Sequence, residues 1–286
     1  MAIDYDKLLH WRIPEVLQRI TRRDVMLYAL GVGLGANPLE RNELRFVYED
    51  GLSVLPTMAL VLAHPGFWLK DPGTGVDWVR IVHAGQTLAI HRTLPVEGTI
   101  VGVSRVVDIV DKGEGKGALL AWERKVYDKA SGDHLCTLVQ TTMCRGDGGF
   151  GGPQRPTAAP HALPGTPPDA ACDLPTLPQS ALLYRLNGDY NPLHADPDVA
   201  RAAGFDRPIL HGLCTLGVAG HAILSACCGH DAARLTGMEA RFSAPVYPGD
   251  VLRTELWIRG GTVSFRTLVP ARGAVVINNG RAAIAP

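Results

Sequence analysis

The sequence lacks an excess of charge, long apolar runs and an abundance of aromatic residues. Its 286 residues contain 28 Lys+Arg and 28 Asp+Glu, a formal net charge of +0, so no global field would attract nucleic acid or anionic lipid. Aromatic residues, at 6%, are few for surfaces that stack on bases. No apolar stretch approaches the roughly 18 residues that span a bilayer. We therefore expect no nucleic-acid or membrane partner.

Signals for export and for disulfide formation are also lacking. The N-terminal segment carries Asp4 and Asp6 where a secretory signal would have basic residues and an apolar run, so we expect the cytoplasm as the location. There are six cysteines and no Cys-x-x-Cys spacing, and a chain of this length needs no disulfide framework. We expect reduced, mostly buried thiols, with the Cys227–Cys228 pair packing at a helix end.

Length and composition allow two domains, and one segment of the chain marks where they would divide. At roughly 150 residues per domain, the chain can form one large domain or two small ones, and its 46% hydrophobic residues suffice for two cores. Glycine and proline interrupt every apolar run between residues 146 and 178, which predicts a linker without helix or strand. A phosphate-binding nest of backbone N–H groups is the alternative. The linker would separate residues 1–145 from residues 179–286.

The two halves repeat one order of elements: a short helix, a main helix and then strands. This order predicts a duplicated α+β unit, with one helix against one antiparallel sheet in each half. The main helix of the second half is predicted to end at Gly229, a favourable C-cap residue. The predicted helices are 24–30 and 55–63 in the first half and 180–186 and 211–228 in the second, and the predicted strands include 83–88, 99–103, 247–252 and 262–269.

The most polar irregular segment lies early in the second half and contains Asp189, Asn191 and His194. It precedes a helix that Asp196 is predicted to cap, with Pro197 at its first position. A carboxylate and an imidazole five residues apart on such a loop can converge on one water molecule and act as an acid/base pair.

Gly212 is predicted to open the second main helix, directly after His211. The unpaired N–H groups and the dipole of a first helical turn favour negative charge, and a glycine lets a ligand oxygen approach the backbone closely. A water-activating pair facing such a donor suits a reaction through an oxyanion, for example addition of water to an α,β-unsaturated thioester. We expect His211 to shape this turn and His221, on the same helix, to be a packing or surface residue.

Five motifs, two in the second half and three in the first, can be compared with known families. They are Tyr184-x-x-x-Gly188-Asp189-x-Asn191-Pro192-Leu193-His194, Gly204-Phe205-Asp-x-Pro208-Ile-Leu-His211-Gly212-Leu213, Arg23-Asp-Val-x-Leu-Tyr28, Leu55-Pro56-Thr57 and Asp111-Lys112-Gly113. They resemble the motifs of the MaoC-like (R)-specific 2-enoyl-CoA hydratases, the hydratase 2 family, in the two-part form found in eukaryotic multifunctional β-oxidation enzymes. The resemblance implies a double hotdog fold, in which each of two antiparallel sheets wraps around a helix. It also implies reversible hydration of trans-2-enoyl-CoA to (3R)-3-hydroxyacyl-CoA without metal or redox cofactor.

The resemblance also implies roles for individual residues. Asp189 and His194 would hold the water that adds to C3 and handle the proton exchanged at C2, with Asn191 in the same network. The spacing leaves open which of the two moves which proton. The N–H of Gly212 would stabilise the thioester enolate. Substrate or CoA contacts are implied for His83, Ala84, Lys112, Tyr190, Pro192, Leu193 and Phe242.

The first half is expected to shape the site without catalysing the reaction. Its loop between Tyr28 and Pro38 has neither a carboxylate nor an imidazole where the second half has its polar loop. Its main helix, nine residues against eighteen, would leave a gap of roughly 13 Å beside the sheet. We hypothesise that this gap admits a long or bulky acyl chain. Ala84 departs from the His-Gly pair common in the family, and its methyl group would hinder close backbone approach there.

Other interpretations stay open at this stage. Each motif residue alone has a structural explanation: a helix end for Asp189, a turn for Asn191, a hydrogen-bonded histidine for His194, a solvated turn for Lys112 and core packing for Phe242. Rival functions are a thioesterase, a dehydratase of branched, dicarboxylic or sterol-derived acyl-CoA, and a non-catalytic acyl-CoA-binding subunit. A metal site is disfavoured because no second histidine or cysteine lies at a ligand spacing. A homodimer could form through an exposed sheet edge or face.

Overall fold

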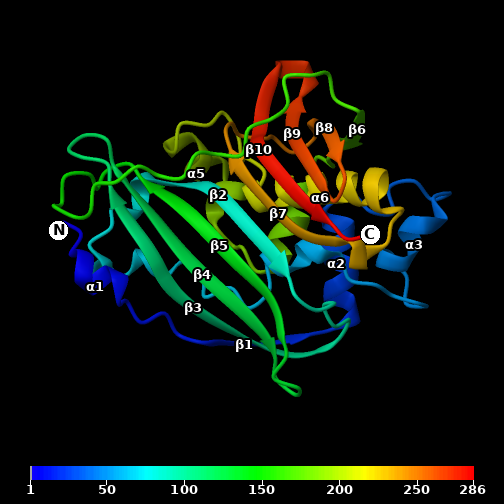
Figure 1. Ribbon diagram of the computed structural model, residues 1–286, viewed down its shortest axis with the longest axis horizontal. Coiled ribbons are helices and arrows are strands. Elements are labelled where there is room, and N and C mark those ends of the chain that lie inside the picture. Colours follow the sequence, from blue (N-terminus) through cyan, green and yellow to red (C-terminus); the bar gives the residue numbers. More distant parts are fainter. Residues whose placement is uncertain (1) are drawn as a thin grey trace.

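The computed structural model describes residues 2–286. Its strands all pair antiparallel in one ten-stranded sheet with the order β1-β3-β4-β5-β2-β7-β10-β9-β8-β6 (Figure 1). The strands are β1 (Val16–Ile20), β2 (Ile81–Ile90), β3 (Gly98–Asp111), β4 (Ala118–Asp128), β5 (His134–Cys144), β6 (Ala170–Pro175), β7 (Leu235–Phe242), β8 (Val251–Arg259), β9 (Thr262–Val269) and β10 (Ala274–Ile284). The helices are α1 (Tyr5–Leu9), α2 (Arg22–Gly31), α3 (Arg41–Val47), α4 (Ser180–Tyr184), α5 (Pro197–Ala202) and α6 (Gly212–Cys228). Short 3₁₀ segments are η1 (Pro56–Leu60), η2 (Trp68–Lys70), η3 (Pro72–Thr74), η4 (Trp78–Arg80), η5 (Arg185–Asn187), η6 (Pro192–His194), η7 (Ala232–Arg234) and η8 (Pro270–Arg272).

The two halves of the chain join through the pairing of β2 with β7, which runs from Gly85 opposite Arg241 to Ala89 opposite Gly237. The first-half strands lie on one side of this seam and those of the second half on the other. The α6 helix packs against β6, β7, β8 and β10, whereas η1 contacts β2 and β5. The expected α+β architecture, built from two antiparallel units, is therefore present.

The second half follows the sequence prediction closely. The α6 helix ends at Gly229, whose φ of 58° is left-handed, as predicted for this C-cap. Asp196 caps α5 by accepting from the backbone N–H groups of Asp198 and Val199, and β9 has the predicted bounds. One strand starts later than predicted. Residues 247–250 form a turn in which the carboxylate of Asp250 accepts from the N–H of Tyr247, so β8 begins at Val251.

The main helix predicted for the first half, residues 55–63, is wrong. Only the 3₁₀ segment η1 forms there, continued by a backbone bond from Leu62 to Ala59. Ala63 has a φ of 47°, a left-handed conformation that ends any helix before Pro65. All five residues of η1 are buried, so tertiary packing decided the conformation of an apolar segment whose composition alone suggested a helix.

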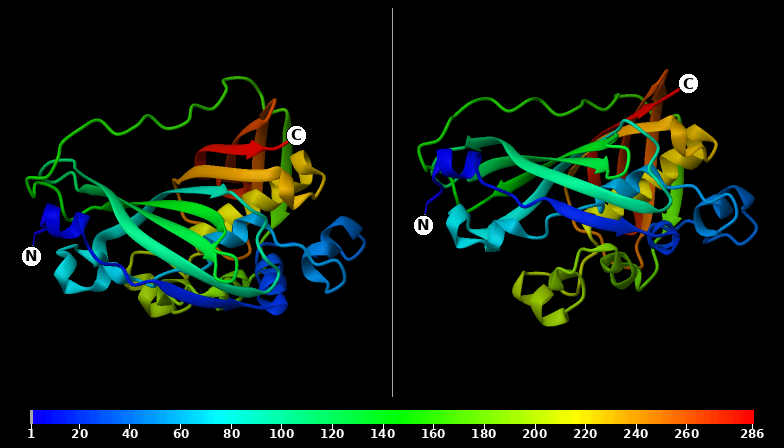
Figure 2. Two further views of the ribbon diagram at one scale, coloured as in Figure 1. Left: turned by 60° about the horizontal axis from the view of Figure 1, so that its bottom comes forward. Right: turned by 90° about the horizontal axis from the view of Figure 1, so that it is seen from below.

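The predicted linker contains a strand, which corrects the expectation that residues 146–178 have none. Ala170–Pro175 form β6, which pairs with β8 at the end of the sheet, and an edge position tolerates the proline. The preceding stretch runs over the surface from one half to the other (Figure 2). Its glycine N–H groups do form a nest, but the occupant is a carboxylate of the protein: Asp111 accepts from Gly149 at 2.8 Å and from Gly151 at 3.0 Å.

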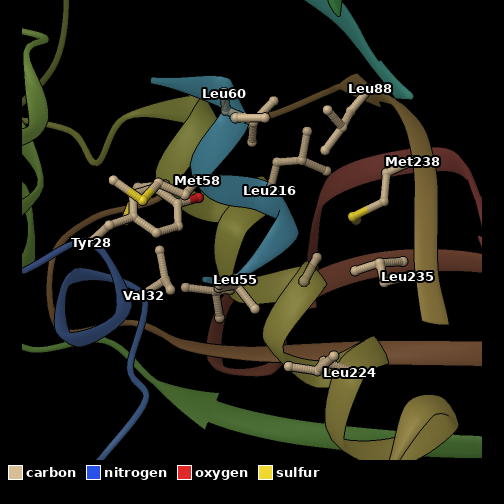
Figure 3. Packing of buried hydrophobic residues seen from close by; sticks show 14 of the residues in the cluster. Tyr28, Val32, Leu55, Met58, Leu60, Leu88, Leu216, Leu224, Leu235 and Met238 are labelled. Carbon is tan, nitrogen blue, oxygen red and sulfur yellow. The ribbon is translucent and has the colours of Figure 1, made fainter. Parts of the chain in front are cut away.

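The largest hydrophobic core lies between α6, α2, η1 and the sheet. Side chains from all of these elements meet in Figure 3, where Tyr28 lies beside Met58. The Tyr28 hydroxyl donates to the carbonyl of Thr57 at 2.8 Å. His221 is also buried, and its Nε2 lies 3.0 Å from a carboxylate oxygen of Glu43, so it is a packing residue with a polar partner.

Cysteine burial agrees with the sequence prediction. All six thiols are free, and four of them are buried. Within residues 2–286, no helix is both long and apolar enough to cross a membrane.

Two glycines let α6 approach its neighbours closely. A Cβ at Gly220 would lie 2.5 Å from Cγ2 of Thr57, and one at Gly217 would lie 2.7 Å from Cγ1 of Val32. Such distances are too short for an added methyl group, so part of η1 or α2 would have to move.

We predict that Gly220→Ala lowers the free energy of unfolding by about 1–2 kcal/mol, because overpacking outweighs the helix propensity gained. Urea denaturation measures the change. The buried Thr57 hydroxyl has no hydrogen-bond partner among the described residues, so Thr57→Ala should be mild and should relieve the clash in the double variant. Additive effects of the two substitutions would contradict this packing account.

Candidate active site

The polar loop of the second half is held by its own side chains. After α4 and η5 the chain turns at Gly188, with a φ of 118°, into Asp189. The N–H of Asn191 donates to a carboxylate oxygen of Asp189 at 3.2 Å, and Oδ1 of Asn191 accepts from the N–H of Leu193 at 3.1 Å. Asn191 therefore fixes the loop and the orientation of the Asp189 carboxylate.

His194 presents one free ring nitrogen. Its Nδ1 lies 2.8 Å from the carbonyl oxygen of Ile209 and must carry a proton to donate to it. In the neutral ring, Nε2 then has a lone pair. Burial lowers the pKa of the imidazole, although the hydrogen bond to Ile209 and the charge of Asp189 oppose this shift. His194 is thus a neutral base with a fixed tautomer at pH 7.

His211 has a larger structural role than the sequence suggested. It is the N-cap residue of α6, and its Nε2 donates to the backbone carbonyl of Asp189 at 3.2 Å. Its ring stacks on that of His194, with centroids 3.7 Å apart and an interplanar angle of 27°. Burial, with the neighbouring His194, lowers the pKa of His211 to about 3. It therefore stays neutral and ties the start of the helix to the loop.

The structure brings the carboxylate and the imidazoles together. One carboxylate oxygen of Asp189 and one ring nitrogen each of His194 and His211 lie within 4.8 Å of one another. This is also a spacing that metal ligands adopt, but the ring planes argue against a metal. Imidazole lone pairs lie in the ring plane, and the planes of two stacked rings do not meet at one ion between them.

The first half contributes the opposite wall. The ring of His83 packs edge-on against Phe242, with centroids 4.8 Å apart, and a Cβ at Gly212 would lie 3.3 Å from Cε1 of Phe242. Burial lowers the pKa of His83 to about 4, and the charge of Asp189 is near enough to oppose this. Ala84 lies at a break in the β2–β5 register between His83 and Gly85, a bulge that redirects the backbone.

The start of α6 leaves backbone donors free. The helix has no side-chain cap at its N-terminus, and the N–H of Gly212 has no acceptor within the helix itself. The glycine lies beside Phe242 and directly follows His211, which holds the Asp189 loop. A developing negative charge next to Gly212 would therefore meet both an N–H donor and the positive end of the helix dipole.

Four of the predicted binding residues lie at or beyond the edge of the group formed by Asp189, His194, His211 and Gly212. Tyr190 is exposed and lies under the guanidinium of Arg185, 5.1 Å from Cζ to the ring centroid. Pro192 is exposed and Leu193 half-buried on η6. Lys112 is exposed in the β3–β4 turn, and the structure records no contact between it and the centre, so its role stays a prediction.

Two cavities lie beside η1, the segment that forms in place of the predicted first-half helix. The smaller has a volume of about 10 Å³, room for about one water molecule, and is lined by Leu60, His64, Gln86, Trp122, Arg124, Leu138, Gln140 and Leu213. The larger has a volume of about 260 Å³ and is lined by Val54, Pro56, Ile90, His91, Arg92, Thr93, Leu94, Ala232, Ala233 and Thr236. The hypothesis that a gap beside this segment admits the acyl chain stays a prediction. The sequence analysis missed Arg124, although a charged residue in the alternating apolar pattern of Leu120, Trp122 and Val126 could have revealed it.

Comparisons with known proteins match both halves of the chain. The "MaoC like domain" family matches residues 160–279, and the "MFE-2 hydratase 2 N-terminal domain" family matches residues 19–146. A probable enoyl-CoA hydratase 2 of Dictyostelium discoideum is 37% identical over 100% of this chain and 98% of its own length. A 3-hydroxyacyl-thioester dehydratase Y of Mycobacterium tuberculosis is 40% identical over 98% of both chains. The chain belongs to the MaoC-like hydratase 2 family.

Solved structures agree with this membership. A MaoC-like dehydratase from Phytophthora capsici superposes with a TM-score of 0.87 at 32% identity, covering 99% of both chains. The full-length peroxisomal multifunctional enzyme type 2 of Drosophila melanogaster gives a TM-score of 0.82 at 33% identity, over 95% of this chain and 48% of that one. A Mycobacterium tuberculosis protein described as a double hotdog fold, 16% identical with a TM-score of 0.57, shares the fold. The predicted double hotdog is confirmed.

Proposed function

We propose that this hydratase 2 family member catalyses the reversible hydration of trans-2-enoyl-CoA to (3R)-3-hydroxyacyl-CoA. The observation that carries the proposal is the free Nε2 of a neutral His194 beside the Asp189 carboxylate, at the N-terminus of α6. Relatives named enoyl-CoA hydratase 2 and 3-hydroxyacyl-thioester dehydratase support both directions of the reaction. One geometry serves both because hydration and dehydration share their transition state.

The acid/base step follows from the protonation states. A water held between Nε2 of His194 and the Asp189 carboxylate gives a proton to Nε2 as its oxygen bonds to C3 of the enoyl group. The electrons of the C2–C3 double bond move toward the thioester carbonyl and form an enolate. The proton taken up by the imidazole is then available for C2. One water is added, and no other reactant is consumed.

The negative charge of the enolate needs a donor that is in place beforehand. The N–H of Gly212 and the positive end of the α6 dipole supply one, and Phe242 with His83 closes the opposite side of the site. A developing oxyanion is stabilised strongly by such a fixed donor in a partly desolvated site. We propose Gly212 as the oxyanion donor and His83 with Phe242 as the wall that holds the thioester.

The rival functions predict different products. A thioesterase would release free thiol, whereas a hydratase removes the absorbance of the conjugated thioester and leaves the thioester bond intact. A non-catalytic binding subunit would do neither. The combination of a base with a fixed tautomer, a carboxylate and a helix N-terminus favours the hydratase.

Three expectations stay predictions: the absence of metal and redox cofactors, a homodimer and a cytoplasmic location. Hydration transfers no electrons, so it needs no redox partner. The sheet ends at β1 and β6, whose edges offer surfaces on which a second copy could pair. Several relatives, among them one from Arabidopsis thaliana, are named peroxisomal.

We predict that Asp189→Asn lowers the kcat for hydration of crotonyl-CoA by about 100-fold or more. The neutral amide is a weaker hydrogen-bond acceptor than the carboxylate, and it has an NH2 donor in place of one oxygen. Loss of absorbance at the conjugated thioester band measures the rate, and chiral analysis should identify (3R)-3-hydroxybutyryl-CoA. Asp198→Asn, the same change at an exposed position of α5, is the matched control and should leave the rate within about twofold. Undiminished turnover of the Asp189 variant would refute its assignment.

Lys112 provides a separate test of CoA binding. If its ammonium group pairs with a CoA phosphate, Lys112→Ala should raise KM about three- to tenfold for CoA thioesters and leave that for pantetheine thioesters unchanged. Lys116→Ala, in the same exposed turn, is the control. Equal effects of the two substitutions, or an equal effect on both types of thioester, would show that Lys112 does not bind a CoA phosphate.

A further inference from the structure

A second group of carboxylate and imidazole side chains lies where the two halves of the chain meet, away from the proposed catalytic centre. Glu43 belongs to α3 of the first half, whereas His221 lies on α6 and His230 directly follows the C-cap of that helix at Gly229. One carboxylate oxygen of Glu43 and one ring nitrogen of each histidine lie within 4.8 Å of one another, and all three residues are buried. The group has the composition and the spacing of a set of metal ligands.

Hydrogen bonds orient two members of this group. Nδ1 of His221 lies 3.3 Å from the carbonyl oxygen of Val32 and carries the proton that it donates there, so Nε2 of the neutral ring has a lone pair. In Glu43, Oε2 accepts from the N–H of Gly35 at 2.7 Å, which leaves Oε1 directed toward His221. Histidines and carboxylates that bind metals are held by hydrogen bonds of this kind on the side away from the ion.

The atoms of His221 and Glu43 that face each other are both acceptors when the ring is neutral. Nε2 of His221 lies 3.0 Å from Oε1 of Glu43. Because two lone pairs repel, a proton or a metal ion must lie between these atoms. Nitrogen and oxygen ligands of one tetrahedral zinc ion are about 3.3 Å apart. The observed separation therefore fits a shared ion as well as it fits a hydrogen bond.

His230 distinguishes these two explanations. The residue is 8% exposed, and its Nε2 is buried without a hydrogen-bond partner in the part of the chain that the structure describes. A proton shared by His221 and Glu43 would leave this nitrogen unsatisfied, at the cost of a buried polar group. An ion bound by all three side chains satisfies it. The residue is already tied to α3, because Nη1 of Arg45 donates to the carbonyl of His230 at 3.3 Å.

We propose that Glu43, His221 and His230 bind one Zn²⁺ ion, which links α3 of the first half to α6 of the second. Two imidazoles and a carboxylate are a ligand set that Zn²⁺ accepts at a low coordination number, which suits a buried site. The Glu43 side chain is 12% exposed, so the ion and a water molecule as fourth ligand have access from solvent.

The role of this ion is structural. His221 follows Gly212 by nine residues, about 14 Å along the axis of α6. The ion therefore takes no part in hydration, and the expectation of a reaction without a metal cofactor is unaffected. The three ligands come together only when both halves are folded and associated, so the free energy of binding adds to the stability of the fold.

Titration of the full-length chain, freed of metal with EDTA, tests the proposal. Zinc chloride is added in competition with a chromophoric chelator, and we expect one ion per chain with a Kd of about 1 µM or below. Zn²⁺ at about 100 times this Kd should raise the Tm by about 5 °C. Glu43→Gln and His230→Gln should each weaken binding by about 100-fold or more and abolish the rise in Tm. Glu49→Gln and His10→Gln, the same changes at exposed positions, are the matched controls and should leave the affinity unchanged.

Two results of the titration would overturn the proposal. One is a wild-type chain that binds Zn²⁺ with a Kd above about 100 µM. The other is binding that the Glu43 and His230 variants retain, because the ion would then lie at other side chains. If the variants fail to fold, a wild-type crystal soaked in zinc chloride decides. An anomalous difference peak between the three side chains at the zinc absorption edge supports the proposal, and ordered side chains with no peak between them contradict it.

Discussion

The pairing of β2 with β7 is the constraint on which the site depends. These strands come from different halves of the chain, and their register places His83, just beyond the paired segment, against Phe242. Phe242 in turn touches the first residue of α6, where His211 holds the Asp189 loop by its backbone carbonyl. The carboxylate, the imidazole and the helix N-terminus all lie on second-half elements, but their enclosure requires the first half. This explains physically why a half without acid/base residues is part of the enzyme.

Histidines perform unequal tasks in this arrangement. His194 has one nitrogen fixed by Ile209 and one free, which suits a base, whereas His211 uses its proton to hold the loop. His83 and His211 are kept neutral by burial, with pKa values of about 4 and about 3. The rings of His83 and His211 therefore add no positive charge beside the Asp189 carboxylate.

The sequence predicted features that depend on local chemistry. Asp196 as an N-cap, Gly229 as a C-cap and the polar loop around Asp189 all follow from preferences of a few neighbouring residues. Features that tertiary packing decides were harder to predict from the sequence. The η1 segment resembles a helix in composition, and β6 contains a proline that an edge strand accepts. The role of His211 depends on contacts that no spacing along the chain reveals.

The pH dependence of kcat/KM for crotonyl-CoA hydration tests the central claim most directly, namely that neutral His194 is the base. Hydration requires the unprotonated ring, so the rate should be constant near pH 7 and fall as pH decreases through the pKa of His194. Because burial lowers this pKa below the ordinary value of about 6.5, the midpoint of the fall should lie below pH 6.5. An acid limb with its midpoint at or above pH 6.5, or one that persists unchanged in His194→Gln, would contradict the account.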